Sequence, residues 1–194
     1  MIILKLGGSL LSKPILQEWL TLAAEQGKGQ VVIVPGGGVF ADQVRETQQQ
    51  WHYNDAIAHQ MAILAMHQMA LLFQGLSAEL VLIEKIENIR PTLQAHKVVV
   101  WLPLMAELNA LNIPATWDVT SDSLAAYLGQ ELVAKQLILV KSAKIIDSDN
   151  MQQWTEKGLV DKALSATVNK LNIAVECLQS DQLPQFKQRL IHYA

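Results

Sequence analysis

A lysine and two clusters of glycine are the residues of this sequence best suited to hold an anion. Lys5 stands directly before the first cluster in KLGGSLL, residues 5–11, and the second cluster lies in VPGGGVF, residues 34–40. Glycine lets backbone N–H groups approach an anion closely, and a helix that starts behind the loop adds its positive end. The ammonium of Lys5, at the end of an apolar stretch, needs water or an anion beside it. Both clusters are therefore candidate phosphate sites, although tight turns and a lysine that reaches the surface would explain the same residues.

Two carboxylates four residues apart form a second candidate, in WDVTSDS at residues 117–123. Thr120 or Ser121 can cap the helix predicted through the following LAAYLG, and Asp122 in its first turn would interact favourably with the helix dipole. A metal site is disfavoured, because no His or Cys partner accompanies the pair. The remaining interpretation gives Asp118 and Asp122 separate tasks in one reaction.

Histidines and further acidic residues are weaker candidates. His59 and His67 are eight residues apart on roughly one face of a predicted helix, but no third ligand at metal spacing accompanies them, so packing is favoured. Asp42 and Asp55 can add to an acidic wall or be ordinary helix-start residues. His52, in the segment QQWHYND between two predicted helices, could close over a substrate.

The composition of the chain limits which partners and which cellular compartment are expected. The formal net charge is -3 and no basic run occurs, which argues against nucleic acid. The single cysteine excludes an intrachain disulfide and fits a reducing cytoplasm. The N-terminus lacks the basic start of a signal peptide, and the most apolar window, 61–73, is too short for a bilayer, so no membrane segment is expected. With 51% hydrophobic and 17% charged residues, we expect a homo-oligomer that covers some apolar surface.

Short apolar runs alternate with longer helical patterns along the chain. Strands are predicted at 2–6, 31–34, 80–83, 98–102 and 136–140, with a weaker candidate at 173–178, and the clearest helices at 12–27, 39–51 and 55–73. Strands separated by helices favour parallel pairing, and hence an α/β fold: a three-layer αβα sandwich with a mostly parallel central sheet. The length of 194 residues without a convincing linker predicts a single domain over 1–194. Ligands of such sheets lie outside the carboxyl ends of the strands, where both glycine clusters fall.

Two common nucleotide motifs are not supported. A P-loop requires GxxxxGK[ST], which does not occur in the sequence. Gly36, Gly38 and Ala41 satisfy a loose GxGxxA with Asp55 downstream, but the dinucleotide fingerprint normally follows the first strand, and this one follows the second. A Rossmann dehydrogenase is therefore disfavoured.

Three segments in order, KLGGSLL, VVIVPGGGVFAD and WDVTSDSLAAYLG, resemble the amino acid kinase family over roughly residues 1 to 147. The third segment and the helix at 55–73 are most similar to the branch that includes the aminomethylfuranmethanol phosphate kinase of methanofuran biosynthesis. The resemblance implies an amino acid kinase-like fold, with an acceptor-side lobe over about 1–115 and an abbreviated nucleotide-side lobe over about 116–194. It also implies a cytoplasmic kinase that uses ATP and Mg²⁺ to phosphorylate a small molecule.

The resemblance further implies roles for single residues. Lys5 would stabilise the transferred phosphoryl group, and Asp122 would orient the catalytic lysines. Nucleotide-binding roles fall on Gly7, Gly8, Ser9, Lys141 and Lys144, and acceptor-binding roles on Gly36, Gly37, Gly38 and Asp118. Lys141, Lys144 and Lys162 of the segment GLVDK compete for the role of a second catalytic lysine.

Asp118 departs from the pattern of the family, because acetylglutamate kinases use asparagine at this position to hold substrate. A carboxylate here would repel a phosphate or carboxylate and attract an ammonium group. We therefore expect the acceptor to be a small phosphorylated amine, 5-(aminomethyl)-3-furanmethanol phosphate, which becomes a diphosphate. The alternatives are a kinase of another small phosphate or carboxylate, of the isopentenyl phosphate, UMP or acetylglutamate type, and a non-catalytic nucleotide-binding protein of the same fold.

Overall fold

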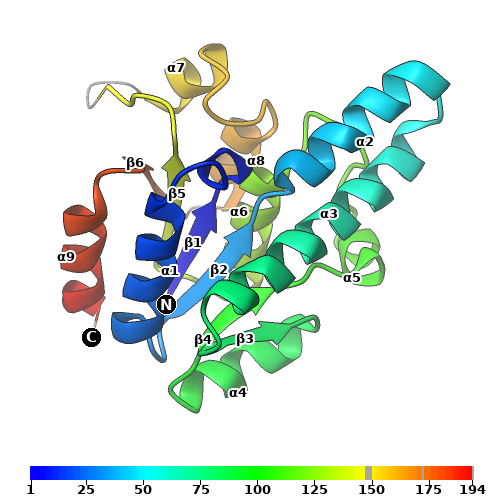
Figure 1. Ribbon diagram of the computed structural model, residues 1–194. Coiled ribbons are helices and arrows are strands. Elements are labelled where there is room, and N and C mark those ends of the chain that lie inside the picture. The colour runs from blue at the N-terminus through cyan, green and yellow to red at the C-terminus, as the bar shows by residue number, and fades with distance from the viewer. Residues whose placement is uncertain (147–149, 172, 194) are drawn as a thin grey trace.

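The strands of the protein form one continuous parallel sheet. The computed structural model describes residues 1–146, 150–171 and 173–193. Within them, a six-stranded sheet has the order β3-β4-β2-β1-β5-β6, and neighbouring strands pair in parallel (Figure 1). The strands are β1 (Ile2–Leu6), β2 (Val31–Pro35), β3 (Leu80–Ile83), β4 (Val98–Trp101), β5 (Gln136–Lys141) and β6 (Ala174–Gln179). The predicted α/β fold class with its parallel central sheet is confirmed.

Helices cover both faces of this sheet. They are α1 (Ile15–Gln26), α2 (Gly38–Trp51), α3 (Asp55–Leu76), α4 (Ile89–Gln94), α5 (Met105–Ala110), α6 (Ser121–Glu131), α7 (Met151–Glu156), α8 (Leu164–Leu171) and α9 (Leu183–Tyr193), with short 3-10 turns η1 (Gly8–Leu10) and η2 (Ile86–Asn88). One hydrophobic core joins the sheet to α1, α9 and the C-terminal half of α3, and a second joins it to α4, α6 and α8. The three layers of the predicted sandwich follow from these two cores.

The alternation of side chains along β1 decides where Lys5 points. Ile2, Leu4 and Leu6 belong to the core beneath α1 and α9, whereas Ile3 belongs to the core beneath α6. Successive side chains of a strand point to opposite faces, so Lys5 shares the face of Ile3. Because β1 lies between β2 and β5 in the sheet, this position is buried on all sides except at the carboxyl end of the strands.

The starts of three helices differ in how they are capped. Ser12, predicted as the cap of α1, lies before a helix that begins at Ile15, and its hydroxyl donates instead to the carbonyl of Ser9 at 3.4 Å. Asn54 caps α3, because its side chain accepts a hydrogen bond from a backbone N–H of the first turn at 3.0 Å. Thr120 occupies the N-cap position of α6, as predicted, but its hydroxyl donates to the carboxylate of Asp161, in the segment between α7 and α8.

α3 is the longest helix among the described residues, and it projects beyond the sheet side by side with α2 (Figure 1). Within the described part of the chain, it is the helix that passes a test of length and hydropathy for crossing a bilayer. One side of α3 packs into both hydrophobic cores, which is typical of a core helix. The other side exposes Ile57, Met61, Leu64, Leu71 and Leu76.

The sheet crosses the lobe boundary that was predicted near residue 115. β1 to β4 come from the predicted acceptor-side lobe, and β5 and β6 come from the predicted nucleotide-side lobe. β1 pairs directly with β5, with Lys5 beside Leu139 in the register. The division into two lobes within one domain stays a prediction.

Candidate active site

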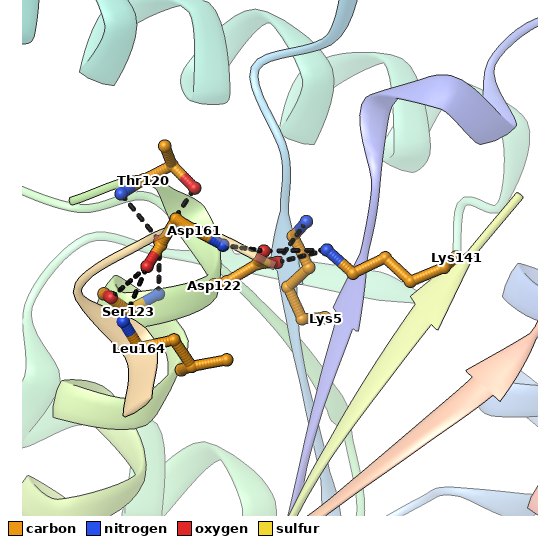
Figure 2. Close-up of polar contacts among 7 residues, drawn as sticks. All are labelled: Lys5, Thr120, Asp122, Ser123, Lys141, Asp161 and Leu164. Atoms are coloured by element: carbon orange, nitrogen blue, oxygen red, sulfur yellow. Dashed lines mark hydrogen bonds and ion pairs between the residues drawn. The ribbon is translucent and has the colours of Figure 1, made fainter. Parts of the chain in front are cut away.

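Asp122 holds two lysine ammonium groups at the carboxyl end of the sheet (Figure 2). Its Oδ1 lies 2.6 Å from Nζ of Lys5, and its Oδ2 lies 2.7 Å from Nζ of Lys141. Lys5 comes from β1, Lys141 is the last residue of the neighbouring β5, and Asp122 lies in the first turn of α6. Two cations and one anion leave this buried cluster with one net positive charge.

Burial and the neighbouring cations act on this carboxylate in opposite directions. Burial alone would raise the pKa of Asp122, but the charges and hydrogen bonds of Lys5 and Lys141 together bring the pKa well below its usual range. Burial also lowers the pKa of Lys141, and the charge of Lys5 lowers it further, while Asp122 opposes this shift. Asp122 is therefore ionised at neutral pH, and it is suited to hold two cations together rather than to exchange protons.

Asp161, which no sequence motif singled out, holds the start of α6 with its carboxylate (Figure 2). Its Oδ2 accepts hydrogen bonds from the backbone N–H groups of Thr120 (2.8 Å) and Ser123 (3.0 Å) and from the Thr120 hydroxyl (2.9 Å). Its Oδ1 accepts from the Ser123 hydroxyl at 2.6 Å and from the N–H of Leu164 at 2.8 Å. The N–H of Asp161 donates to Oδ2 of Asp122 at 3.3 Å. Asp161 thus fixes the turn that carries Asp122.

The two glycine loops touch each other beside the lysine cluster. A Cβ on Gly8 would lie 2.1 Å from Cα of Gly38, and a Cβ on Gly36 would lie 2.9 Å from the backbone nitrogen of Gly8. Gly38 also has a φ of 56°, in the left-handed region that favours glycine. A Cβ on Gly7 would lie 3.6 Å from Nζ of Lys5. The close approach of the two backbones therefore requires glycine. Glycines that only formed tight turns would not need to be this close to each other.

A cavity of about 510 Å³ opens beside these loops. Of the predicted site residues, those that line it are Lys5, Gly8, Ser9, Gly36, Gly37 and Gly38. The structure therefore gathers the first lysine, the predicted nucleotide loop and the predicted acceptor loop around one space. Their individual roles stay predictions.

Other predicted site residues lie outside the described lining of this cavity. The carboxylate of Asp118 pairs with Nζ of Lys162 at 3.2 Å, and both side chains are largely exposed. Lys144 is exposed in the segment after β5. Of the three lysines that compete for the second catalytic role, Lys141 is the one whose ammonium contacts Asp122. The acceptor role of Asp118 and the nucleotide role of Lys144 stay predictions without a contact that supports them.

The lining of the cavity also contains an arginine stacked on a tryptophan. The guanidinium carbon of Arg45 lies 4.3 Å from the ring centroid of Trp117, and the same guanidinium pairs with Asp42 at 3.2 Å. The indole N–H of Trp117 donates to the amide oxygen of Gln48, and the amide N–H of Gln48 donates to Asp55 at 2.9 Å. All but Gln48 line the cavity, so Asp42 and Asp55 do belong to its wall. Arg45 and Trp117 were not predicted as site residues, although the tryptophan beside Asp118 in WDVTSDS is a signal that could have pointed to them.

The three histidines singled out from the sequence have different places. His59 is buried and lines the cavity. His67 hydrogen bonds through Nε2 to the carbonyl of Pro103 at 2.8 Å, which agrees with the packing interpretation. His52 ends α2 with a φ of 56° and lies outside the described lining of the cavity.

This fold and site define a class of protein. The sequence profile of the amino acid kinase family matches residues 1–162. Because the match covers more than half of the 194 residues, the chain belongs to the amino acid kinase family, and the predicted family is confirmed.

Known proteins resemble particular parts of the chain. The [5-(aminomethyl)furan-3-yl]methyl phosphate kinase of Methanocaldococcus jannaschii is 31% identical over 142 residues, which make up 71% of this chain but only 63% of that protein. The uridylate kinase of Archaeoglobus fulgidus superimposes with a TM-score of 0.72 and 16% identity, over 96% of this chain and 95% of that chain. An isopentenyl phosphate kinase superimposes with a TM-score of 0.64 and 14% identity, over 99% of this chain and 96% of that chain. At these identities the two solved structures show the shared fold.

Proposed function

We propose that this protein is an ATP-dependent kinase that transfers the γ-phosphoryl group to a small phosphorylated amine and so forms a diphosphate. The observation that carries this proposal is the Lys5–Asp122–Lys141 cluster beside two touching glycine loops at one cavity. Membership of the amino acid kinase family supports a phosphotransferase. The relative from M. jannaschii supports [5-(aminomethyl)furan-3-yl]methyl phosphate as the acceptor, and hence a role in methanofuran-type cofactor biosynthesis.

The site residues suit what phosphoryl transfer requires. The reaction needs the attacking and leaving oxygens in line, with cations and N–H donors around the three equatorial oxygens. In the proposed reaction, an oxygen of the acceptor phosphate attacks the γ-phosphorus, and the bond to the β-phosphate oxygen breaks as ADP leaves. Lys5 and Lys141 would compensate the negative charge of the moving group, and Asp122 keeps the two ammonium groups together against their mutual repulsion.

The remaining predicted residues take their roles from their place around this cluster. The nucleotide phosphates would lie against Gly7, Gly8 and Ser9, with Lys141 at the end of β5 and Lys144 in the segment after it. The acceptor would lie against Gly36, Gly37 and Gly38, and Asp118 is retained as a candidate for contact with its amine. We propose Lys141 as the second catalytic lysine, because its ammonium contacts Asp122 whereas that of Lys162 contacts Asp118.

Mg²⁺ is proposed as the companion of ATP. It commonly uses substrate phosphates, water and one or two carboxylates as ligands. Asp122 is already bound to two lysines, and within the described residues no group of three His, Cys, Asp or Glu side chains is placed to hold a metal. The ATP phosphates and water would therefore supply most of the ligands of Mg²⁺. Turnover should stop on addition of excess EDTA and return with Mg²⁺.

A homo-oligomer in the cytoplasm is also part of the proposal. The exposed apolar side chains of α3 recur at Ile57, Met61, Leu64 and Leu71, which places them on one side of the helix. A second copy of the chain would cover this apolar strip. Light scattering should therefore give a mass above that of one chain, and Leu64→Glu should lower the mass.

A second candidate keeps the reaction but changes the acceptor. The fold likeness to uridylate and isopentenyl phosphate kinases leaves open a nucleotide or a small phosphate that carries no amine. The guanidinium of Arg45 in the cavity wall would suit either acceptor. A non-catalytic protein of the same fold would bind ATP without turnover on any acceptor.

A coupled assay of ADP release separates these functions. The wild type is offered ATP, Mg²⁺ and, in turn, [5-(aminomethyl)furan-3-yl]methyl phosphate, isopentenyl phosphate, UMP and acetylglutamate, and the furan phosphate should give the highest kcat/KM. Lys5→Ala should lower kcat by about 10²- to 10³-fold, because it removes one donor to the transferred group. Lys28→Ala is the matched control, since Lys28 is exposed and pairs with Glu79 at 2.9 Å. The proposal fails if no acceptor stimulates ADP release by the wild type above the level of Lys5→Ala.

A further inference from the structure

Charged groups of both signs surround the cavity. Beside the glycine loops, Lys5, Lys141 and Asp122 sum to one positive charge. Elsewhere in the lining, Asp42 and Arg45 pair at 3.2 Å and balance each other. Asp55 and His59 also line the cavity, and both come from α3.

Asp55 carries a carboxylate that no cation among the described residues neutralises. It lines the cavity, and its Oδ1 accepts a hydrogen bond from the neutral amide of Gln48 at 2.9 Å. The side chain is exposed at the start of α3, so a ligand in the cavity can reach it. Its negative charge remains available to a ligand.

His59 lies one helical turn after Asp55 on the same face of α3. It is 7% exposed and lines the cavity, and within the described residues nothing hydrogen bonds to its ring. Burial lowers the pKa of its imidazole, so the ring is neutral at neutral pH and offers one nitrogen as an acceptor. The ring nitrogens are not sealed inside the protein but reach the cavity, so a ligand there can hydrogen bond to them.

The matching ligand group must donate several hydrogen bonds and carry positive charge. An ammonium group does both, because it has three donors and no acceptor. Four further lining residues, Ala62, Ile63, Met66 and Leu124, are apolar, which suits a small ring. A compact molecule with an amine at one end and a phosphate at the other fits this arrangement.

We propose that Asp55 and His59 bind the ammonium group of the acceptor and thereby set the specificity of the enzyme. This inference rests on the proposed kinase function and places amine recognition on α3 instead of Asp118. With the amine on α3, the phosphate of the acceptor faces the glycine loops and Lys5, where it must lie for transfer. The amine is remote from the reacting atoms, so its binding contributes to KM rather than to kcat.

The test compares two acceptors that differ at the amine. One is [5-(aminomethyl)furan-3-yl]methyl phosphate. The other is its hydroxymethyl counterpart, in which a neutral hydroxyl of similar size replaces the ammonium group and the phosphate is kept. Steady-state ADP release is measured for the wild type, Asp55→Asn and His59→Gln. Asp181→Asn is the matched control, because Asp181 is also exposed and accepts a hydrogen bond from a glutamine amide, that of Gln179 at 3.1 Å.

The wild type should prefer the amine, and Asp55→Asn should lower kcat/KM for the amine by about 10- to 100-fold through KM, with kcat little changed. The hydroxymethyl acceptor should lose much less, and His59→Gln should shift the preference in the same direction by a smaller factor. Asp181→Asn should leave both acceptors as in the wild type. A change in kcat alone for Asp55→Asn, or an equal loss for both acceptors, would overturn the inference.

Failure of the inference and failure of the proposed function give different results. If the wild type turns over the amine but Asp118→Asn loses the preference while Asp55→Asn keeps it, the kinase function stands and the assignment to α3 is wrong. If the wild type turns over neither acceptor, the proposed function is wrong. In that case calorimetric titration with both acceptors decides, because equal affinities of the wild type and Asp55→Asn for the amine would refute the recognition site.

Discussion

Replacing Asp161 by asparagine tests whether the turn that carries Asp122 is held from outside α6. Asparagine keeps the shape of the side chain but replaces one accepting oxygen by an NH₂ group. If the nitrogen of asparagine takes the place of Oδ2, the backbone N–H groups of Thr120 and Ser123 lose their acceptor. If it takes the place of Oδ1, the backbone N–H of Leu164 loses its acceptor. The second orientation is cheaper, because the Ser123 hydroxyl that also faces Oδ1 can rotate to accept.

The cost follows from the bonds that this cheaper orientation loses or weakens. One backbone N–H is left without its charged acceptor, which costs about 1.5–3 kcal/mol. The bonds to the remaining oxygen change from charge-assisted to neutral and weaken as well. Asp161→Asn should therefore lower the free energy of unfolding by about 2–4 kcal/mol. For a chain of this size, Tm should fall by on the order of 10 °C.

Urea unfolding followed by circular dichroism measures this loss, and ADP release measures its effect on the site. Because Asp122 sits in the turn that Asp161 holds, kcat should fall by on the order of 10²-fold, the usual effect of small misplacement. Asp181→Asn, at an exposed carboxylate, should stay within about 0.5 kcal/mol of the wild type. A free energy of unfolding for Asp161→Asn equally close to the wild type would refute the role given to Asp161.

Three other measurements probe the packing and charge of the site. Gly8→Ala should lower kcat by on the order of 10²-fold, because its Cβ would lie 2.1 Å from Cα of Gly38, whereas Gly75→Ala, with no atom within 4 Å, should leave activity unchanged. The pKa of Asp122 lies below its ordinary value in the folded protein. The ionised carboxylate therefore contributes its full stabilisation to the folded state above about pH 4, and this contribution is lost as the pH falls further. In urea titrations below about pH 4, the free energy of unfolding of the wild type should therefore fall more steeply than that of Asp122→Asn, by up to about 1.4 kcal/mol per pH unit. Burial raises the pKa of Cys177 to about 11, so Ellman's reagent at about pH 8 should react with this thiol only after unfolding, and rapid reaction of the folded protein would contradict its burial.

The fold was predictable because the composition of the strands and the helices that separate them both indicate a parallel sheet. The strands are short apolar runs rich in β-branched residues, and the helices between them allow parallel crossovers. Residues 2–6 and 31–34 were predicted as strands and became β1 and β2 within a residue. The last strand was the weakest signal, because β6 lies at the edge of the sheet and is only partly buried, so its sequence is less uniformly apolar.

Site residues were predictable only where a short segment of the sequence was enough to recognise them. Lys5 and the glycines could be found because an ammonium in a buried strand and glycine at a strand end each need an explanation in their own segment. Asp161 escaped prediction because its partners Thr120 and Ser123 lie about forty positions earlier, as the separations of 41 and 38 residues show. Asp55 and His59 were visible in the sequence, but only the fold shows that their shared face of α3 lines the cavity.

The choice between the candidate lysines follows from the strand order. Asp122 receives Lys5 from β1 and Lys141 from β5, and these two strands are neighbours in parallel register. Both cations therefore come from the centre of the sheet, where the register fixes their separation. A lysine from the GLVDK segment is not needed at Asp122, and Lys162 pairs with Asp118 instead. The charge cluster thus depends on β1, β5 and α6, all of which end by residue 141, while Asp161 adds the support that holds α6 in place.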